Sequence, residues 1–144
     1  MNFSIIKGAQ VSGLSAEIIS VETDVGRGFS LLQIVGLADR AVGESKERIL
    51  AALKNSKLPS PKTKNQRVTI SLSPSDIRKE GSGFDLPIAI SYLAATGEIN
   101  SKKYSILKDS VFVGELSLDG KIKPVTGVAP IVLKAQNLGY KNIY

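Results

Sequence analysis

The chain has 144 residues, of which 42% are hydrophobic and 22% charged, as is typical of one soluble globular domain. It contains no cysteine and no histidine, which excludes thiolate nucleophiles, Cys/His zinc sites, serine–histidine triads and imidazole acid–base catalysis. Lys and Arg number 19 against 13 Asp and Glu, so the net charge is +6, which favours a polyanionic partner without establishing one.

The first residues, 1–4, lack the basic region and the apolar core of a signal peptide. The longest apolar runs span only a few residues, too few to cross a bilayer as a helix. We therefore expect a cytoplasmic protein that makes no contact with a membrane.

Alternating and β-branched residues predict strands at 3–6, 16–23, 31–35, 68–72, 111–113 and 121–123. Apolar periodicity and helix-ending residues predict helices at 38–53, 86–96 and 128–138. The Asp119-Gly120 pair predicts a two-residue type I′ hairpin turn, and the last residues, 142–144, predict the beginning of another strand. This order predicts an α+β fold of mixed α/β layers in one domain, 1–144, truncated near its C-terminal end.

In the first predicted helix, Glu44 and Arg48 lie four residues apart, on the side expected to face solvent. The second predicted helix is apolar nearly all round. We therefore expect it at the centre of the domain.

A charged, glycine-rich loop leads into this second helix, and we consider it the candidate functional loop. Its members are Arg78, Lys79, Glu80, Gly81, Ser82, Gly83 and Asp85. The two glycines allow backbone conformations closed to other residues, and Asp85 is a suitable N-cap whose replacement by Ala should cost about 1 kcal/mol. The charges of Arg78, Lys79 and Glu80 form either a surface for another subunit or for phosphate, or a solvated loop.

Carboxylates near this loop suggest, at first sight, a site for Mg²⁺ or for acid–base chemistry. They are Asp76, Glu80 and Asp85, but acids beside a glycine loop more often cap helices or pair with neighbouring cations, here Arg78 and Lys79. We therefore expect no metal site. The G-x-x-x-x-G-K-[ST] motif is also absent, so the chain cannot bind nucleotide through a P-loop.

A second candidate site is the run from 54 to 67, which is basic and has no acidic residue. Its cations are Lys54, Lys57, Lys62, Lys64 and Arg67. They are candidates for contact with phosphate or DNA, and the alternative is a solvated helix end and loop. No aromatic residue lies between Phe29 and Phe84, which argues against a base-stacking platform in this stretch and leaves phosphate contact alone.

Several motifs are spread along the chain from Ile5 to its end. They are Gly28-Phe29, 34–37, Ala41-Val42, Glu44-Ser45 with Arg48, 68–70, Ser73-Pro74, 76–87 and the hairpin 114–120. In combination they resemble the N-terminal, ChlI-like domain of the Mg-chelatase-like AAA+ ATPases of the ComM/YifB type. The resemblance implies the ribosomal-protein domain-two-like fold of the C-terminal domains of Lon protease and RadA.

The resemblance also implies a cellular role. Proteins of this family carry a following AAA+ module that binds ATP and Mg²⁺, assemble as hexamers, and are associated with competence, DNA recombination, helicase activity and branch migration. This fragment would then be a non-catalytic, Lon-like domain that serves oligomer assembly, DNA guidance or both, and would need no cofactor of its own. A magnesium-chelatase-related subunit is an alternative that rests on the family label.

The likeness to Lon raises the possibility of a serine–lysine peptidase dyad. An ungapped match places Gly83 at the position of the nucleophile, a one-residue slip would supply Ser82, and the position of the lysine is occupied by Ala129. Because a serine without a base is a poor nucleophile near neutral pH, we expect no catalytic residue in this fragment. The alternative is an atypical dyad of Ser82 with a lysine from another element: Lys79, Lys121 or Lys123.

Overall fold

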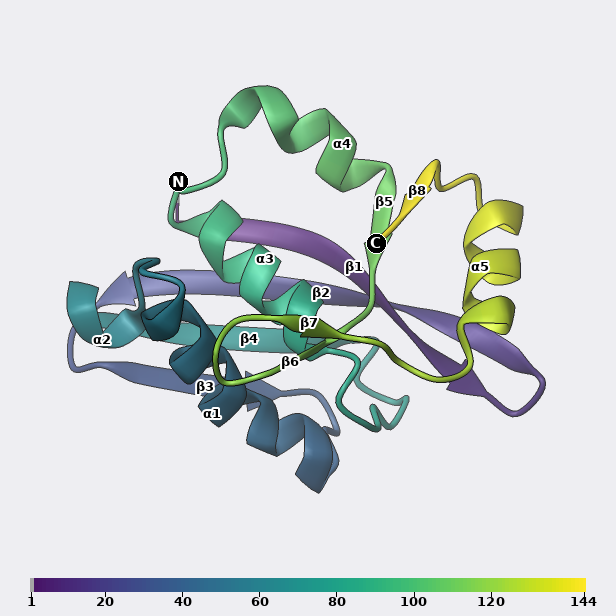
Figure 1. The fold of residues 1–144 in the computed structure, drawn as a ribbon, viewed down its shortest axis with the longest axis horizontal. Helices are drawn as coiled ribbons and strands as arrows, with labels where there is room; N and C mark the ends of the chain where they lie inside the picture. Colours follow the sequence, from purple (N-terminus) through teal and green to yellow (C-terminus); the bar gives the residue numbers. More distant parts are fainter. Residues whose placement is uncertain (1) are drawn as a thin grey trace.

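The computed structural model describes residues 2–144, and for Ser101 only the backbone. Its main feature is a six-stranded sheet with the order β3-β4-β2-β1-β5-β8 (Figure 1). The strands are β1 (Phe3–Ser12), β2 (Ser15–Arg27), β3 (Leu31–Val35), β4 (Gln66–Ser73), β5 (Ser110–Phe112) and β8 (Asn142–Ile143). The pairs β1–β2 and β2–β4 are antiparallel, whereas β1–β5, β3–β4 and β5–β8 are parallel.

Helices cover both faces of this sheet. They are α1 (Arg40–Asn55), α2 (Pro61–Lys64), α3 (Asp85–Ala95), α4 (Tyr104–Lys108), which follows a 3₁₀ turn (Ser101–Lys103), and α5 (Val128–Asn137). Helices α1 and α3 pack together on one face, over buried side chains that include Ile19, Val21 and Ile70. Ala9 and Ala16 point to the other face, where they pack against α5. The predicted α+β fold of mixed α/β layers is therefore confirmed.

Three hydroxyl groups lie in the core where α3 crosses β1 and β2. Ser91 Oγ is 2.8 Å from Ser4 Oγ and 2.7 Å from Thr23 Oγ1, and Ser4 Oγ also donates to the Ser91 carbonyl at 2.7 Å. A buried hydroxyl without a partner would cost about 1–3 kcal/mol. Because these three satisfy one another, they stabilise one position of α3 along the strands.

The structure confirms the three predicted helices and the predicted strands, with differences in extent. The first two strands are longer than predicted, because β1 and β2 pair with each other continuously from Phe3 opposite Asp24 to Ser12 opposite Ser15. Helices α2 and α4, by contrast, were not among the predicted helices. Helix α2 begins with a capping box, in which the side chains of Ser60 and Thr63 each form a hydrogen bond with the backbone amide of the other residue.

The predicted turn at Asp119-Gly120 lies in a separate hairpin, formed by β6 (Glu115–Leu116) and β7 (Ile122–Lys123). The turn type is wrong, because Ser117 N donates to the Lys121 carbonyl at 2.9 Å, which leaves three residues in the loop. Gly120 has a φ of 92° and is the residue that closes this loop.

Candidate functional site

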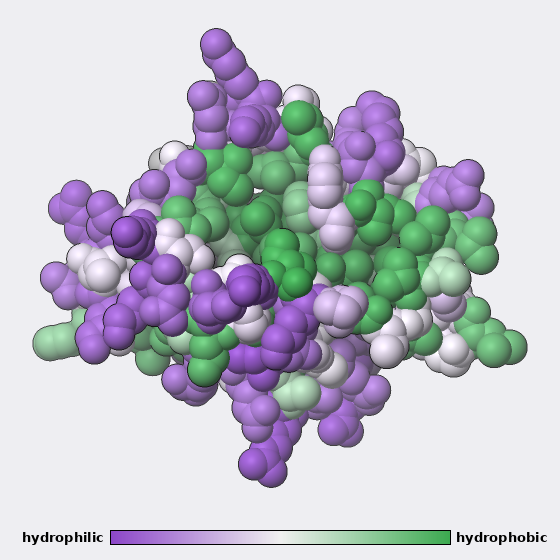
Figure 2. Space-filling view, viewed as in Figure 1, coloured by the Kyte–Doolittle hydropathy of each residue, from purple (hydrophilic) through white to green (hydrophobic). Residues whose placement is uncertain are grey.

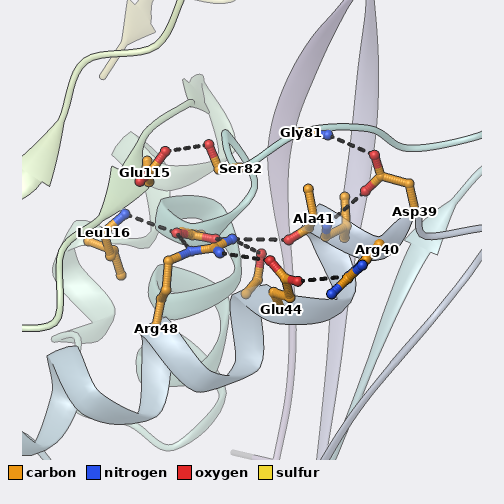
Figure 3. A network of polar contacts seen from close by, with 12 residues as sticks. Asp39, Arg40, Ala41, Glu44, Arg48, Gly81, Ser82, Glu115 and Leu116 are labelled. Carbon is orange, nitrogen blue, oxygen red and sulfur yellow. Dashed lines mark hydrogen bonds and ion pairs between the residues drawn. The ribbon is translucent and has the colours of Figure 1, made fainter.

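The candidate functional loop enters α3 through Asp85, which is the first helical residue and is fully buried. Its carboxylate accepts hydrogen bonds from Arg48 Nε at 2.6 Å, from Arg48 Nη2 at 3.0 Å and from the Leu116 amide at 3.0 Å (Figure 3). The N-cap position is occupied by Phe84, without a side-chain cap. The prediction of Asp85 as an N-cap is therefore wrong. Its carboxylate instead joins α3 to α1 and to the β6–β7 hairpin.

Arg48 is the cation of this junction, and its side chain is only 20% exposed. It also donates to the Ala41 carbonyl at 3.0 Å and to Ser45 Oγ at 3.2 Å (Figure 3). The hydrogen bonds with Asp85 raise the pKa of Arg48 above its ordinary value, against the opposing effect of burial. The expected position of Arg48 on the solvated side of the helix is wrong, and its contact with Glu44, at 4.0 Å, is the weaker one.

Lys79 is also fully buried, although it was expected to be part of an exposed charged surface. Its ammonium group donates to the Gly36 carbonyl at 2.6 Å and to the Pro74 carbonyl. Burial lowers the pKa of Lys79, because desolvation disfavours the charged form. The prediction of Lys79 as a surface residue is therefore wrong, and its contacts join the loop to the end of the sheet.

The remaining charges of the loop, Arg78 and Glu80, are exposed and lie 3.8 Å apart at their closest charged atoms. Gln10 of β1 holds the backbone between them, since its amide nitrogen donates to the Arg78 carbonyl at 2.7 Å and its oxygen accepts from Glu80 N at 3.0 Å. The Gly81 amide donates to Asp39 at 3.2 Å (Figure 3). The loop is thus fixed by side chains from β1 and from the N-cap of α1.

Ser82 Oγ donates to a carboxylate oxygen of Glu115 at 2.5 Å (Figure 3). The other oxygen of Glu115 lies 4.0 Å from Lys123 Nζ. Among residues 2–144, no hydrogen bond joins Ser82 to a lysine. The two other lysines considered for a dyad are engaged elsewhere, Lys79 with carbonyl groups and Lys121 with Asp119 at 3.6 Å. A carboxylate acceptor therefore occupies the place where a serine–lysine dyad would require a neutral amine.

An open cavity of about 560 Å³ lies beside this loop, and Gly81, Ser82 and Gly83 form part of its wall. We call it the acidic cleft, because its lining includes Asp39, Glu80 and Glu115 but neither Lys nor Arg. An acidic lining repels phosphate rather than attracting it. Contact with phosphate at this loop is therefore disfavoured, apart from the exposed guanidinium of Arg78.

The basic run lies at the other end of α1. All five of its cations are exposed: Lys54, Lys57, Lys62, Lys64 and Arg67. They come from the last turn of α1, from the connection after it, from α2 and from the first residues of β4. The structure therefore gathers these side chains at one end of the sheet.

The residues that hold the candidate loop were not predicted from the sequence. Only one of them, Asp39, has a local signal from which it could have been predicted. Asp39 directly precedes α1 and accepts from Val42 N at 2.8 Å, as an N-cap does. Gln10 and Glu115 carry no such signal, because they act across 70 and 33 residues of sequence.

Two features are absent from the part of the chain that the structure describes. No helix in it is both long and apolar enough to cross a membrane. Within the same residues, no three acidic side chains come together as ligands for a metal ion.

Comparison with known proteins identifies the family. Residues 21–144 match the family model described as subunit ChlI of Mg-chelatase. The chain is 37% identical over 136 residues to competence protein ComM of Haemophilus influenzae, covering 94% of this chain and 26% of that protein. It is 36% identical over 143 residues to the uncharacterized protein YifB of Escherichia coli, covering 99% of this chain and 27% of that protein.

A more distant likeness links the chain to proteolytic enzymes. Lon protease of Mycolicibacterium smegmatis is 22% identical over 144 residues, covering 97% of this chain and 18% of that protein. The chain spans about a quarter of the length of ComM and YifB. The resemblance inferred from the motifs is confirmed: the chain belongs to the Mg-chelatase ChlI family and is homologous to ComM and YifB.

Proposed function

We propose that this domain is a non-catalytic part of a Mg-chelatase-like AAA+ ATPase that acts on DNA in the cytoplasm. In this proposal, ATP and Mg²⁺ are bound by an AAA+ module outside these residues, and the protein works as a hexamer in competence or recombination. The domain itself guides DNA and contributes to assembly. The homology to competence protein ComM supports the proposed role in competence or recombination.

The observation that carries DNA guidance is the separation of charge along α1. This helix begins at the acidic cleft, where Asp39 caps it, and ends in the basic run, where Lys54 lies in its last turn. The run is exposed and contains no acidic residue to neutralise it. A surface of this kind attracts the phosphate backbone through sequence-independent contacts whose strength falls as salt rises.

A charge-removal experiment tests this proposal. The variant Lys54→Ala/Lys62→Ala/Lys64→Ala removes three exposed cations from the basic run. The matched control, Lys102→Ala/Lys103→Ala/Lys108→Ala, removes three exposed lysines near α4. Fluorescence anisotropy with a labelled duplex, over a range of salt concentrations, measures the affinity and its dependence on salt.

The two variants should differ although their net charges are equal. The basic-run variant should bind more weakly and reduce the salt slope by up to about 2.7, because each lost contact with duplex phosphate removes about 0.9. The control should keep nearly the parent slope. Equal losses in both variants, or no binding of the parent even at low salt, would refute DNA guidance. Assembly would then be tested alone, by sedimentation of the protein.

The arrangement around Ser82 supports the non-catalytic part of the proposal. Its hydroxyl donates to Glu115, and the position where the likeness to Lon calls for a lysine is Ala129. Cleavage of casein by the protein, abolished by Ser82→Ala, would refute this part.

A further inference from the structure

Phe29 is an aromatic side chain with no place in the core, since it is 98% exposed. Burying such a side chain would stabilise the fold, so its exposure leaves this gain unused. It lies in the short connection between β2 and β3, at the same end of the sheet as the basic run. An apolar ring among cations requires an explanation other than packing.

The backbone holds this ring outward. Strand β4 lies between β2 and β3, so residues 28–30 must cross the beginning of β4. The Gly28 amide donates to the Asn65 carbonyl at 3.1 Å, which ties the crossing to the residue just before β4. Gly28 has a φ of 148°, a conformation that favours glycine. The connection is therefore short and anchored, and it projects Phe29 away from the sheet.

A hollow of about 560 Å³ opens beside the ring, and we call it the Phe29 hollow. Its lining is Arg27, Gly28, Phe29, Ser30, Lys64 and Asn65. Two cations, two polar side chains and one aromatic ring thus line it, with no acidic group. Figure 2 shows mainly hydrophilic side chains over the end of the molecule that holds α2, where this hollow lies.

We infer that the Phe29 hollow binds single-stranded nucleic acid, with a base stacked on Phe29 and the phosphates beside it held by Arg27 and Lys64. This inference rests on the proposed function, because it names the form of DNA that the basic end recognises. Stacking on an aromatic ring contributes about 1–3 kcal/mol per base and tolerates any sequence. In a duplex the faces of the bases are already covered by their neighbours, so only a single strand can offer one to the ring.

The composition of the hollow favours nucleic acid over a protein partner. Phe29 is the only large apolar side chain in its lining. A protein interface normally has an apolar centre depleted of charge, which the Phe29 hollow lacks. Apolar side chains gather instead around β7, α5 and β8, where Ile122, Val132 and Tyr144 are partly exposed. Figure 2 shows this apolar area away from the end that holds α2.

The lack of tryptophan in the chain provides a direct test. Phe29→Trp places a single indole at the proposed stacking position, and its emission should be quenched when oligodeoxythymidine is added. The control, Leu14→Trp, places the indole in the β1–β2 turn at a side chain that is also fully exposed. Its emission should stay constant. Quenching in neither variant at saturating oligonucleotide would overturn the inference.

An affinity measurement separates this inference from the proposed function. Phe29→Ala should weaken binding of labelled oligodeoxythymidine about 5- to 150-fold, the equivalent of one stacked base, and leave duplex binding nearly unchanged. Parent-like single-strand binding by Phe29→Ala, with weak binding by the basic-run variant, would overturn the role of Phe29 and leave DNA guidance standing. Loss of self-association in Phe29→Ala, measured by sedimentation, would show that Phe29 contacts a second copy of the chain. That result would also overturn the proposed binding of single-stranded nucleic acid.

Discussion

Replacing Asp85 with alanine should be far more damaging than the loss of a helix cap. The substitution leaves the Arg48 side chain, which is 80% shielded from solvent, without its anionic partner, and it leaves the Leu116 amide without an acceptor. Removing one member of a buried ion pair costs about 3–5 kcal/mol, whereas removing an N-cap costs about 1 kcal/mol. We expect a loss of about 4 kcal/mol in the free energy of unfolding, a large part of the 5–15 kcal/mol typical of a folded protein.

Urea unfolding followed by circular dichroism measures this loss. Glu80→Ala serves as the control, because it removes an exposed carboxylate from the same loop and should leave the midpoint nearly unchanged. The double variant Arg48→Met/Asp85→Leu should be more stable than Asp85→Ala, since it leaves no unpaired buried charge. A loss of only about 1 kcal/mol in Asp85→Ala would refute the ion-pair reasoning and restore the role of a simple cap.

Four other predictions concern the backbone, the core and the loop. Gly36→Ala should cost more than about 2 kcal/mol in urea unfolding, because the new Cβ would lie 2.2 Å from the Leu72 carbonyl oxygen at a φ of 109°. Gly43→Ala should instead stabilise the protein by about 0.5–1 kcal/mol, because open space surrounds this position of α1, and a loss there would contradict the reasoning. Burial raises the pKa of Tyr92 from 10.0 to about 12, so the folded state keeps the phenol proton to a higher pH than the unfolded state does. The free energy of unfolding should therefore fall by about 1 kcal/mol between pH 9.5 and 11. This contribution is present below pH 10 and is lost as the pH rises to 12. Tyr92→Phe should lack it. If the free energy of unfolding falls equally with pH in the two proteins, Tyr92 is not its source. Ser82→Ala should keep the parent affinity for duplex DNA in the anisotropy assay, and a marked change would show that the loop takes part in binding.

Local patterns in the sequence were sufficient to predict most of the fold. The signals that predict α1, α3 and α5 arise within each helix: the apolar face of α1, the run of apolar helix formers in α3, and the proline and glycine near the two ends of α5. All three helices are confirmed. Helix α2 was not predicted although its signal is local, since Ser60 and Thr63 at this spacing form a capping box around Pro61. The wrong turn type also had a local cause, because the Asp-Gly pair is compatible with more than one hairpin loop.

The candidate site could be predicted only in part, because the partners of its residues come from distant segments. An aspartate at the beginning of a helix is a common cap, and only the approach of Arg48 from 37 residues away gives Asp85 a different role. Lys79 has charged neighbours on both sides in the sequence, yet the carbonyl of Gly36 reaches it from 43 residues away. The five cations of the basic run are exposed, as both interpretations of this run require, since each is too polar to bury without a partner.

The separation of charge along α1 also determines how a polyanion meets this molecule in solution. The helix has 16 residues, so the acidic cleft and the basic run lie about 24 Å apart, more than twice the Debye length in physiological salt. A polyanion in solution therefore attracts one end of the molecule and repels the other before any contact forms. Attraction at one end and repulsion at the other rotate the molecule, which increases the fraction of collisions in a productive orientation. Low salt should therefore accelerate association more than it slows dissociation.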